Sequence, residues 1–260
     1  MRIIFVRHCD PYYPTDSLTK KGFKEAKLLS QRIKKWNVVK AYSSPMGRAF
    51  TTAKIGLSKN VYVKQNEITV CPWLREFNYP VIDPLTNNKR ASWDLLPEFF
   101  TAEENRDLFD FASWQNNSFL KTGEIASYYK NVCDGLDSIL VEFDYKRNGL
   151  YYSTVRKDGQ SDFMEKSTEV VKTYIDDRTI VIFCHLGVMG AMLSHLLNIS
   201  APCLWQGFFV APSSVTIVNS EERTPGIAYW RVQQMGDTAH LYTKKEPPSS
   251  SGYFASAFAY

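Results

Sequence analysis

The strongest constraint on the fold is an alternation of strand-like and helix-like segments over residues 2–63. The apolar run Arg2–Val6 predicts a strand that ends at a polar stretch. From Thr19 to about Trp36, apolar residues recur every three or four positions, which predicts a helix capped by Thr19. The order then repeats, with a strand over Val38–Tyr42, a helix from Ser43-Ser44-Pro45 to about Leu57 and a strand over Val61–Val63. A β-α-β-α-β order is typical of a parallel sheet covered by helices.

This pattern breaks between Phe77 and Gln160 and resumes afterwards. The interrupting segment is rich in aromatic residues and carries helical patterns over Ala102–Trp114 and Glu124–Phe143. The elements predicted beyond it are a helix, a buried strand, a second helix and two late strands, at Met164–Ile175, Thr179–Cys184, Gly187–Leu197, Val215–Val218 and Ile227–Val232. We therefore predict one three-layer α/β/α domain over residues 1–245, with a mostly parallel central sheet and a helical insertion at about 77–160. Residues 246–260 begin with prolines and serines, which predicts a flexible tail.

Composition excludes several classes of protein. The net charge of +4 is too small to indicate a nucleic-acid partner by itself. No apolar run approaches the roughly 20 residues of a membrane helix, and the apolar start is too short for a signal peptide. The five cysteines are irregularly spaced and form no CxxC pair, so we expect free thiols, no metal site and a cytoplasmic location.

Two of the four histidines directly follow predicted strands. His8 follows the first strand, and His185 lies between the strand ending at Cys184 and the next helix. The carboxyl ends of parallel strands form one edge of a sheet, so both imidazoles are expected in one crevice. Arg7 precedes His8, and Arg48 lies on the helix after the second strand; two guanidinium groups can bind one phosphate. Glu76, in Leu74-Arg75-Glu76, offers a carboxyl group for proton transfer.

Several short segments resemble the motifs of the histidine phosphatase superfamily, which includes the cofactor-dependent phosphoglycerate mutases. Val6-Arg7-His8-Cys9 is similar to the RHG signature, and Leu18-Thr19-Lys20-Lys21-Gly22 to its LTxxG helix entry. The stretch from Ser43 to Ala53 is similar to SSPLxRAxxTA. Three further segments match in the same order: Leu74-Arg75-Glu76, Ile182-Phe183-Cys184-His185 and Gly236-Asp237-Thr238-Ala239-His240-Leu241.

The resemblance implies a phosphohistidine mechanism without a cofactor or metal. His8 would attack phosphorus and carry the phosphoryl group, while Arg7, Arg48 and His185 would bind its oxygens. Glu76 would protonate the leaving oxygen and then activate water. His8 must be neutral to attack, so we expect a backbone carbonyl to fix the tautomer of its ring. The partners implied are a small phosphorylated substrate and inorganic phosphate as product, with no nucleic acid or membrane; a homodimer is left open.

Three positions depart from the family pattern, and three functions therefore stay open. Cys9 and Leu186 replace glycines that usually follow the two histidines, and Pro14 replaces a frequent asparagine. We favour a phosphomonoesterase, because the charged set is complete. The alternatives are a phosphoglycerate mutase and a phosphate-binding or protein-docking module without catalysis.

Other residues receive weaker predictions. Asp10, Tyr12 and Tyr13 follow the first signature and could touch substrate, whereas His195 and His240 are read as structural. The aromatic residues of the insertion more often form a core, although some would wall the substrate site if the insertion overhangs it; they are Trp93, Phe99, Phe100, Phe109, Phe111 and Trp114.

Overall fold

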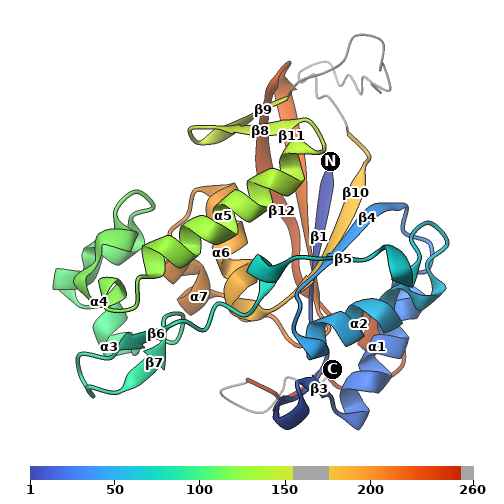
Figure 1. The fold of residues 1–260 in the computed structure, drawn as a ribbon, viewed down its shortest axis with the longest axis horizontal. Helices are drawn as coiled ribbons and strands as arrows, with labels where there is room; N and C mark the ends of the chain where they lie inside the picture. Colours follow the sequence, from blue (N-terminus) through green and yellow to red (C-terminus); the bar gives the residue numbers. More distant parts are fainter. Residues whose placement is uncertain (155–175, 253–260) are drawn as a thin grey trace.

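The structure is a computed structural model that describes residues 1–154 and 176–252. Its centre is an eight-stranded sheet in the order β5-β4-β10-β1-β11-β12-β9-β8 (Figure 1). In chain order these strands are β1 (Arg2–Arg7), β4 (Val38–Ser43), β5 (Thr69–Val70), β8 (Tyr145–Asn148), β9 (Tyr151–Thr154), β10 (Thr179–Cys184), β11 (Val215–Thr224) and β12 (Ile227–Asp237). Two small ladders stand apart from it, β2 (Pro11–Tyr12) with β3 (Ser17–Leu18) and β6 (Pro80–Ile82) with β7 (Lys89–Ala91).

The predicted parallel core of the sheet is confirmed. The strands β5, β4, β10 and β1 pair in parallel, and β1 and β10 run in register from Arg2 opposite Thr179 to Arg7 opposite Cys184. The remaining pairs, from β1–β11 to β9–β8, are antiparallel. Strands β8 and β9 come from the predicted insertion, so this segment extends the main sheet as well as adding helices.

Helices cover both faces of the sheet, as Figure 1 shows. On one side lie α1 (Lys20–Ile33) and α2 (Gly47–Gly56), with α8 (Ala239–Tyr242) against α1. On the other lie α5 (Ile125–Val141), α6 (Leu186–Leu197) and α7 (Ala201–Gly207), with the short helices α3 (Pro97–Phe100) and α4 (Ser118–Lys121) in the insertion. Thr19 caps α1 as predicted, because its side chain accepts the Gly22 N–H at 3.0 Å.

Alternating residues of β1 build two separate cores. Ile3 and Phe5 face the α5–α6 side, whereas Ile4 and Val6 face the α1–α2 side, and all four are at most 3% exposed. Burial of each large apolar side chain contributes about 1.5–3 kcal/mol. A strand with both faces buried is therefore held firmly, which fixes the position of the residues at its carboxyl end.

Three element predictions are wrong. Val61–Val63 is no strand: the Asn60 side chain accepts the N–H groups of Tyr62 and Val63 and bends the chain, and β5 forms later, at Thr69–Val70. The second helix begins at Gly47, so Pro45 is not its first residue.

The third error concerns Ala102–Trp114, which forms 3-10 turns at Glu103–Phe109 and Trp114–Asn116. The buried Asn105 departs from helical geometry, and its side-chain nitrogen donates to the Phe99 carbonyl at 2.9 Å. The helices predicted near α1, α5 and α6 are confirmed, as are the strands β1, β4, β10, β11 and β12. The helix predicted at Met164–Ile175 lies outside the described residues.

The segment 246–252 of the predicted tail packs on the domain. Glu246 forms ion pairs with Lys21 and Lys24 of α1, and Ser249 is fully buried and donates a hydrogen bond to Asp10. Residues 253–260 lie outside the described part of the chain, and the flexibility of the tail stays a prediction.

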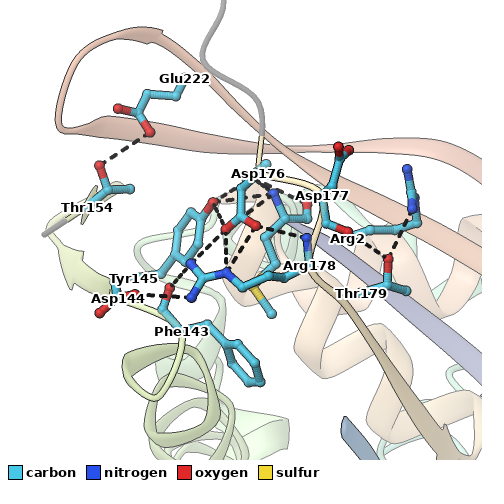
Figure 2. Close-up of polar contacts among 12 residues, drawn as sticks. Arg2, Phe143, Asp144, Tyr145, Thr154, Asp176, Asp177, Arg178, Thr179 and Glu222 are labelled. Atoms are coloured by element: carbon cyan, nitrogen blue, oxygen red, sulfur yellow. Dashed lines mark hydrogen bonds and ion pairs between the residues drawn. The ribbon is translucent and has the colours of Figure 1, made fainter. Parts of the chain in front are cut away.

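A polar cluster stabilises the opposite end of β1 and β10 (Figure 2). Arg178 donates to both carboxylate oxygens of Asp176, to Asp144 at 3.1 Å and to the Phe143 carbonyl at 2.7 Å. Tyr145 also donates to Asp176, at 3.1 Å. These contacts join the end of α5, strand β8 and the start of β10.

Among residues 1–154 and 176–252, no helix combines the length and apolarity required to cross a membrane.

Candidate active site

The two histidines predicted to meet do lie together. His8 follows β1 and His185 follows β10, and the backbone N–H of His8 donates to the Cys184 carbonyl at 3.0 Å. Their ring centroids are 5.0 Å apart, and both residues are buried. Parallel pairing of β1 with β10 therefore brings together two residues that are 177 positions apart in the sequence.

Local contacts fix the chemical form of His8. Its Nδ1 lies 2.8 Å from the Cys9 carbonyl oxygen. A carbonyl only accepts, so Nδ1 carries the proton and Nε2 presents its lone pair. Burial, followed by the positive charge of Arg7, lowers the pKa of His8 to about 3. The expected backbone carbonyl is thus present, and the imidazole is neutral at physiological pH.

The two ring nitrogens of His185 differ in their hydrogen bonds. Its Nε2 lies 2.8 Å from the Ser44 hydroxyl, whereas Nδ1 is buried and has no hydrogen-bond partner within the described residues. Burial, with the nearby His8 and Arg48, lowers the pKa of His185 well below its ordinary value. A buried nitrogen without a partner is unfavourable unless a ligand supplies one.

Both predicted arginines are buried beside the histidines. Arg7 is 6% exposed, donates to the Val210 carbonyl at 2.5 Å and lies under the Phe209 ring at 5.2 Å. Arg48 is 6% exposed, and its Nε has no hydrogen-bond partner among residues 1–154 and 176–252. The charges of both arginines act on His8 and Glu76, which places all four groups in one electrostatic neighbourhood.

Arg48 owes its position to Asp16, which sequence reasoning missed. One oxygen of Asp16 accepts from Arg48 Nη1 at 2.5 Å, and the other accepts the Gly47 N–H at 2.6 Å. The Asp16 backbone adopts a left-handed conformation with φ of 48°, and a Cβ at Gly47 would lie 2.3 Å from the Asp16 carbonyl oxygen. This tertiary pairing sets the start of α2 at Gly47, and a positive φ at an aspartate leaves no readable pattern in a sequence.

Glu76 meets the start of α6. Its Oε1 accepts the N–H groups of Phe77 at 2.8 Å, Gly187 at 2.9 Å and Val188 at 3.3 Å. The first N–H groups of α6, beside His185, therefore bind a carboxylate of the same chain. Desolvation raises the pKa of Glu76 above its ordinary value, although these N–H groups and the arginines oppose the shift. A carboxyl group with a raised pKa is suited to general acid catalysis.

Cys9, which replaces the usual glycine after His8, does not intrude on this site. Cys9 is fully buried and packs in a small apolar cluster with Leu18 and Ala26, so its thiol points toward α1. Burial raises the pKa of this thiol well above its ordinary value, which makes it unreactive as a thiolate. Leu186 begins α6 and packs partly against the larger core.

Comparisons with known proteins give one family match and several solved structures of similar fold. The described residues contain no group of three or more His, Cys, Asp or Glu side chains that could hold a metal ion. The fold and site define an α/β/α protein with paired histidines at the carboxyl edge of a mixed sheet. Residues 3–115 match the family model described as histidine phosphatase superfamily (branch 1). No curated protein matches the sequence.

Solved structures with the same fold include several phosphatases. Phosphoserine phosphatase from Entamoeba histolytica, in complex with phosphoserine, is 18% identical with a TM-score of 0.55, over 92% of this chain and 98% of that chain. Alpha-ribazole phosphatase from Shigella flexneri is 16% identical with a TM-score of 0.50, over 89% and 95%. Mycobacterial glucosyl-3-phosphoglycerate phosphatase is 14% identical with a TM-score of 0.51, over 90% and 97%. The predicted resemblance is confirmed over residues 3–115 by the family model, and the predicted fold is confirmed by the solved structures.

Proposed function

We propose that this protein hydrolyses a phosphomonoester through a phosphohistidine on His8. The observation that carries the proposal is the convergence of two buried neutral imidazoles with two buried guanidinium groups and a half-buried carboxyl group. Within the described residues, Arg48 Nε has no partner and can donate to an equatorial oxygen of a phosphoryl group. His185 Nδ1 also has no partner, and it can donate to a second oxygen when Nε2 accepts from the Ser44 hydroxyl and Nδ1 carries the ring proton. The phosphatase structures of the same fold support this class of reaction.

In the first step, the lone pair of His8 Nε2 attacks phosphorus, and the bond from phosphorus to the leaving oxygen breaks. Glu76, whose pKa is raised by desolvation, gives its proton to that oxygen. Arg7, Arg48 and His185 stabilise the negative charge on the equatorial oxygens, as preorganised donors in a site of low dielectric. The Cys9 carbonyl stabilises the proton on His8 Nδ1 as the ring becomes positively charged.

In the second step, water attacks the phosphohistidine. Glu76 takes a proton from the water, the bond from phosphorus to nitrogen breaks, and His8 returns to its neutral form. The products are the alcohol and inorganic phosphate. We further propose that residues 1–245 form one domain with an insertion at 77–160. The protein would act in the cytoplasm on a small phosphorylated compound.

The test is turnover of a panel of phosphomonoesters by wild type, His8→Ala and Glu76→Gln. Hydrolysis that is abolished in His8→Ala supports the proposal. Interconversion of the two phosphoglycerates at a rate above their hydrolysis would favour a mutase instead. Binding of phosphate without any turnover, with the same affinity in wild type and His8→Ala, would favour a binding module. Wild type remains the reference in each assay, and thermal unfolding verifies that each variant is folded.

A further inference from the structure

Four largely apolar side chains lie around the proposed catalytic groups, and three of them contact one of these groups directly. The Tyr13 ring lies 5.5 Å from the Arg48 guanidinium, and the Phe209 ring lies 5.2 Å from that of Arg7. The Met46 sulfur accepts from Glu76 N at 3.5 Å and from Arg48 Nη2 at 3.6 Å. The fourth is Trp93, and we call Tyr13, Met46, Trp93 and Phe209 the apolar rim. Met46, Trp93 and Phe209 are half-buried, and Tyr13 is exposed.

Trp93 lies near the proposed acid, at the start of α6. A Cβ built on Gly187 would lie 2.8 Å from Glu76 Oε1, 2.8 Å from Trp93 Cδ1 and 3.1 Å from Trp93 Nε1. The indole and the carboxyl group therefore border one point at the start of α6. Trp93 Nε1 is buried and has no hydrogen-bond partner in the described part of the chain. The indole N–H is thus a donor that nothing in residues 1–154 and 176–252 accepts.

Backbone contacts hold Trp93 in this place. The Gln206 side chain donates to the Trp93 carbonyl at 2.7 Å, and the preceding Ser92 N–H donates to the Tyr79 carbonyl at 3.1 Å. The first contact anchors the insertion to α7, and α7 in turn contacts α6. A residue fixed from two sides loses little conformational freedom when it binds a ligand.

We propose that Trp93 is a specificity-determining residue and that the site prefers phosphomonoesters of aromatic alcohols. The inference rests on the proposed function. Glu76 must lie beside the leaving oxygen to protonate it, so the carbon next to that oxygen extends past Trp93. An aromatic group there would stack on the indole, and an oxygen or nitrogen on it would accept the indole N–H.

A competing source of specificity is Arg75, which precedes Glu76 and is exposed. Its positive charge acts on His185, so it lies on the same side of the molecule as the site. An anionic leaving group would be bound there by charge rather than by stacking. The two possibilities predict different substrates, and one experiment separates them.

The experiment compares kcat/KM for benzyl phosphate, ethyl phosphate and phosphoserine. The first two release alcohols of similar acidity, so their ratio reports contact with the ring rather than ease of departure. We expect wild type to prefer benzyl over ethyl phosphate by about tenfold, which corresponds to one good aromatic contact. Trp93→Phe should keep most of this preference, and Trp93→Leu should reduce it to near unity.

Phe109→Ala is the matched control, because Phe109 is an aromatic residue of the same insertion that packs on Phe100 at 4.6 Å. It should leave the benzyl-to-ethyl ratio unchanged, whereas a general loss of stability would lower both rates together. A wild-type ratio near unity overturns the proposal, as does a ratio that survives in Trp93→Leu. Preference for phosphoserine that is lost in Arg75→Ala overturns it in favour of charge recognition.

Binding of two phosphonates separates this inference from the proposed function. Phenylphosphonate and methylphosphonate are not hydrolysed, so their affinities need no turnover. Tighter binding of phenylphosphonate that is lost in Trp93→Leu supports the role of Trp93 even if no phosphoester is cleaved. Equal affinity for both ligands overturns it, whatever the outcome of the activity assays.

Discussion

Replacement of Glu76 by glutamine tests the proposed acid while leaving its surroundings in place. Glutamine has the same shape, and its Oε1 can still accept the N–H groups of Phe77 and Gly187. The variant lacks only the transferable proton. General acid catalysis contributes about 10²–10⁴ in rate. At 1.36 kcal/mol for each factor of ten, the barrier for the first step should rise by about 3–5 kcal/mol.

The size of this effect should depend on the leaving group. Ethyl phosphate releases an alkoxide that needs a proton, so Glu76→Gln should lose the full factor of about 10²–10⁴ in kcat/KM. A nitrophenyl phosphate releases a phenolate that is stable without a proton. Glu76→Gln should therefore leave the rate of the first step for this substrate nearly unchanged. Steady-state rates for both substrates, with trapping of the phosphoenzyme, measure the two losses separately.

The pH profile gives a second readout of the same variant. Glu76 acts when protonated, so kcat/KM for ethyl phosphate should fall as the pH rises through its raised pKa. His8 acts when neutral, and with a pKa of about 3 it should cause no loss between about pH 4 and 6. Glu76→Gln should remove the alkaline fall. Equal losses for the alkyl and aryl substrates, or an unchanged alkaline fall, would refute the assignment of Glu76.

Two further predictions concern residues outside the reacting groups. Gly47→Ala should lower kcat/KM and the melting temperature, since a Cβ would lie 2.3 Å from the Asp16 carbonyl oxygen and displace the carboxylate that holds Arg48; Gly207→Ala, where a Cβ meets nothing within 4 Å, is the control, and equal effects of both would contradict the reasoning. His240 has a folded pKa of about 4, below its unfolded value of 6.5, so the unfolded chain takes up its proton first and stability falls as the pH drops from 6.5 to 4. Denaturant unfolding of His240→Gln should show that the loss in free energy of unfolding is smaller by about 1.4 kcal/mol per pH unit. The same pH dependence in wild type and variant would show that His240 is not its source.

Periodic patterns in the sequence predicted the parallel core and the meeting of His8 with His185. Strands buried on both faces and amphipathic helices leave clear signals, and parallel pairing brings the carboxyl ends of β1 and β10 to one edge. Tertiary contacts decided what the patterns missed. Asp16 sets the start of α2 from 31 residues away, and the Asn60 side chain bends a segment of high strand propensity.

The insertion shows the same limit. Its final hairpin, β8 and β9, joins the main sheet by pairing Ser153 with Ile227. No local signal specifies a partner strand more than 70 residues further along the chain. The indole of Trp93 likewise lies at the start of α6, where the Gln206 side chain of α7 holds its backbone. The sequence alone left open whether this aromatic residue belongs to the core or to the wall of the substrate site.

Whether His8 carries the phosphoryl group can be measured by rapid acid-free quenching of the enzyme during turnover, followed by mass spectrometry of its peptides. We expect a phosphoryl group on the peptide containing His8 that is stable in base, labile in acid and missing in His8→Ala. Turnover of substrate with no phosphoryl group on His8, or the same phosphopeptide in His8→Ala, would contradict this expectation.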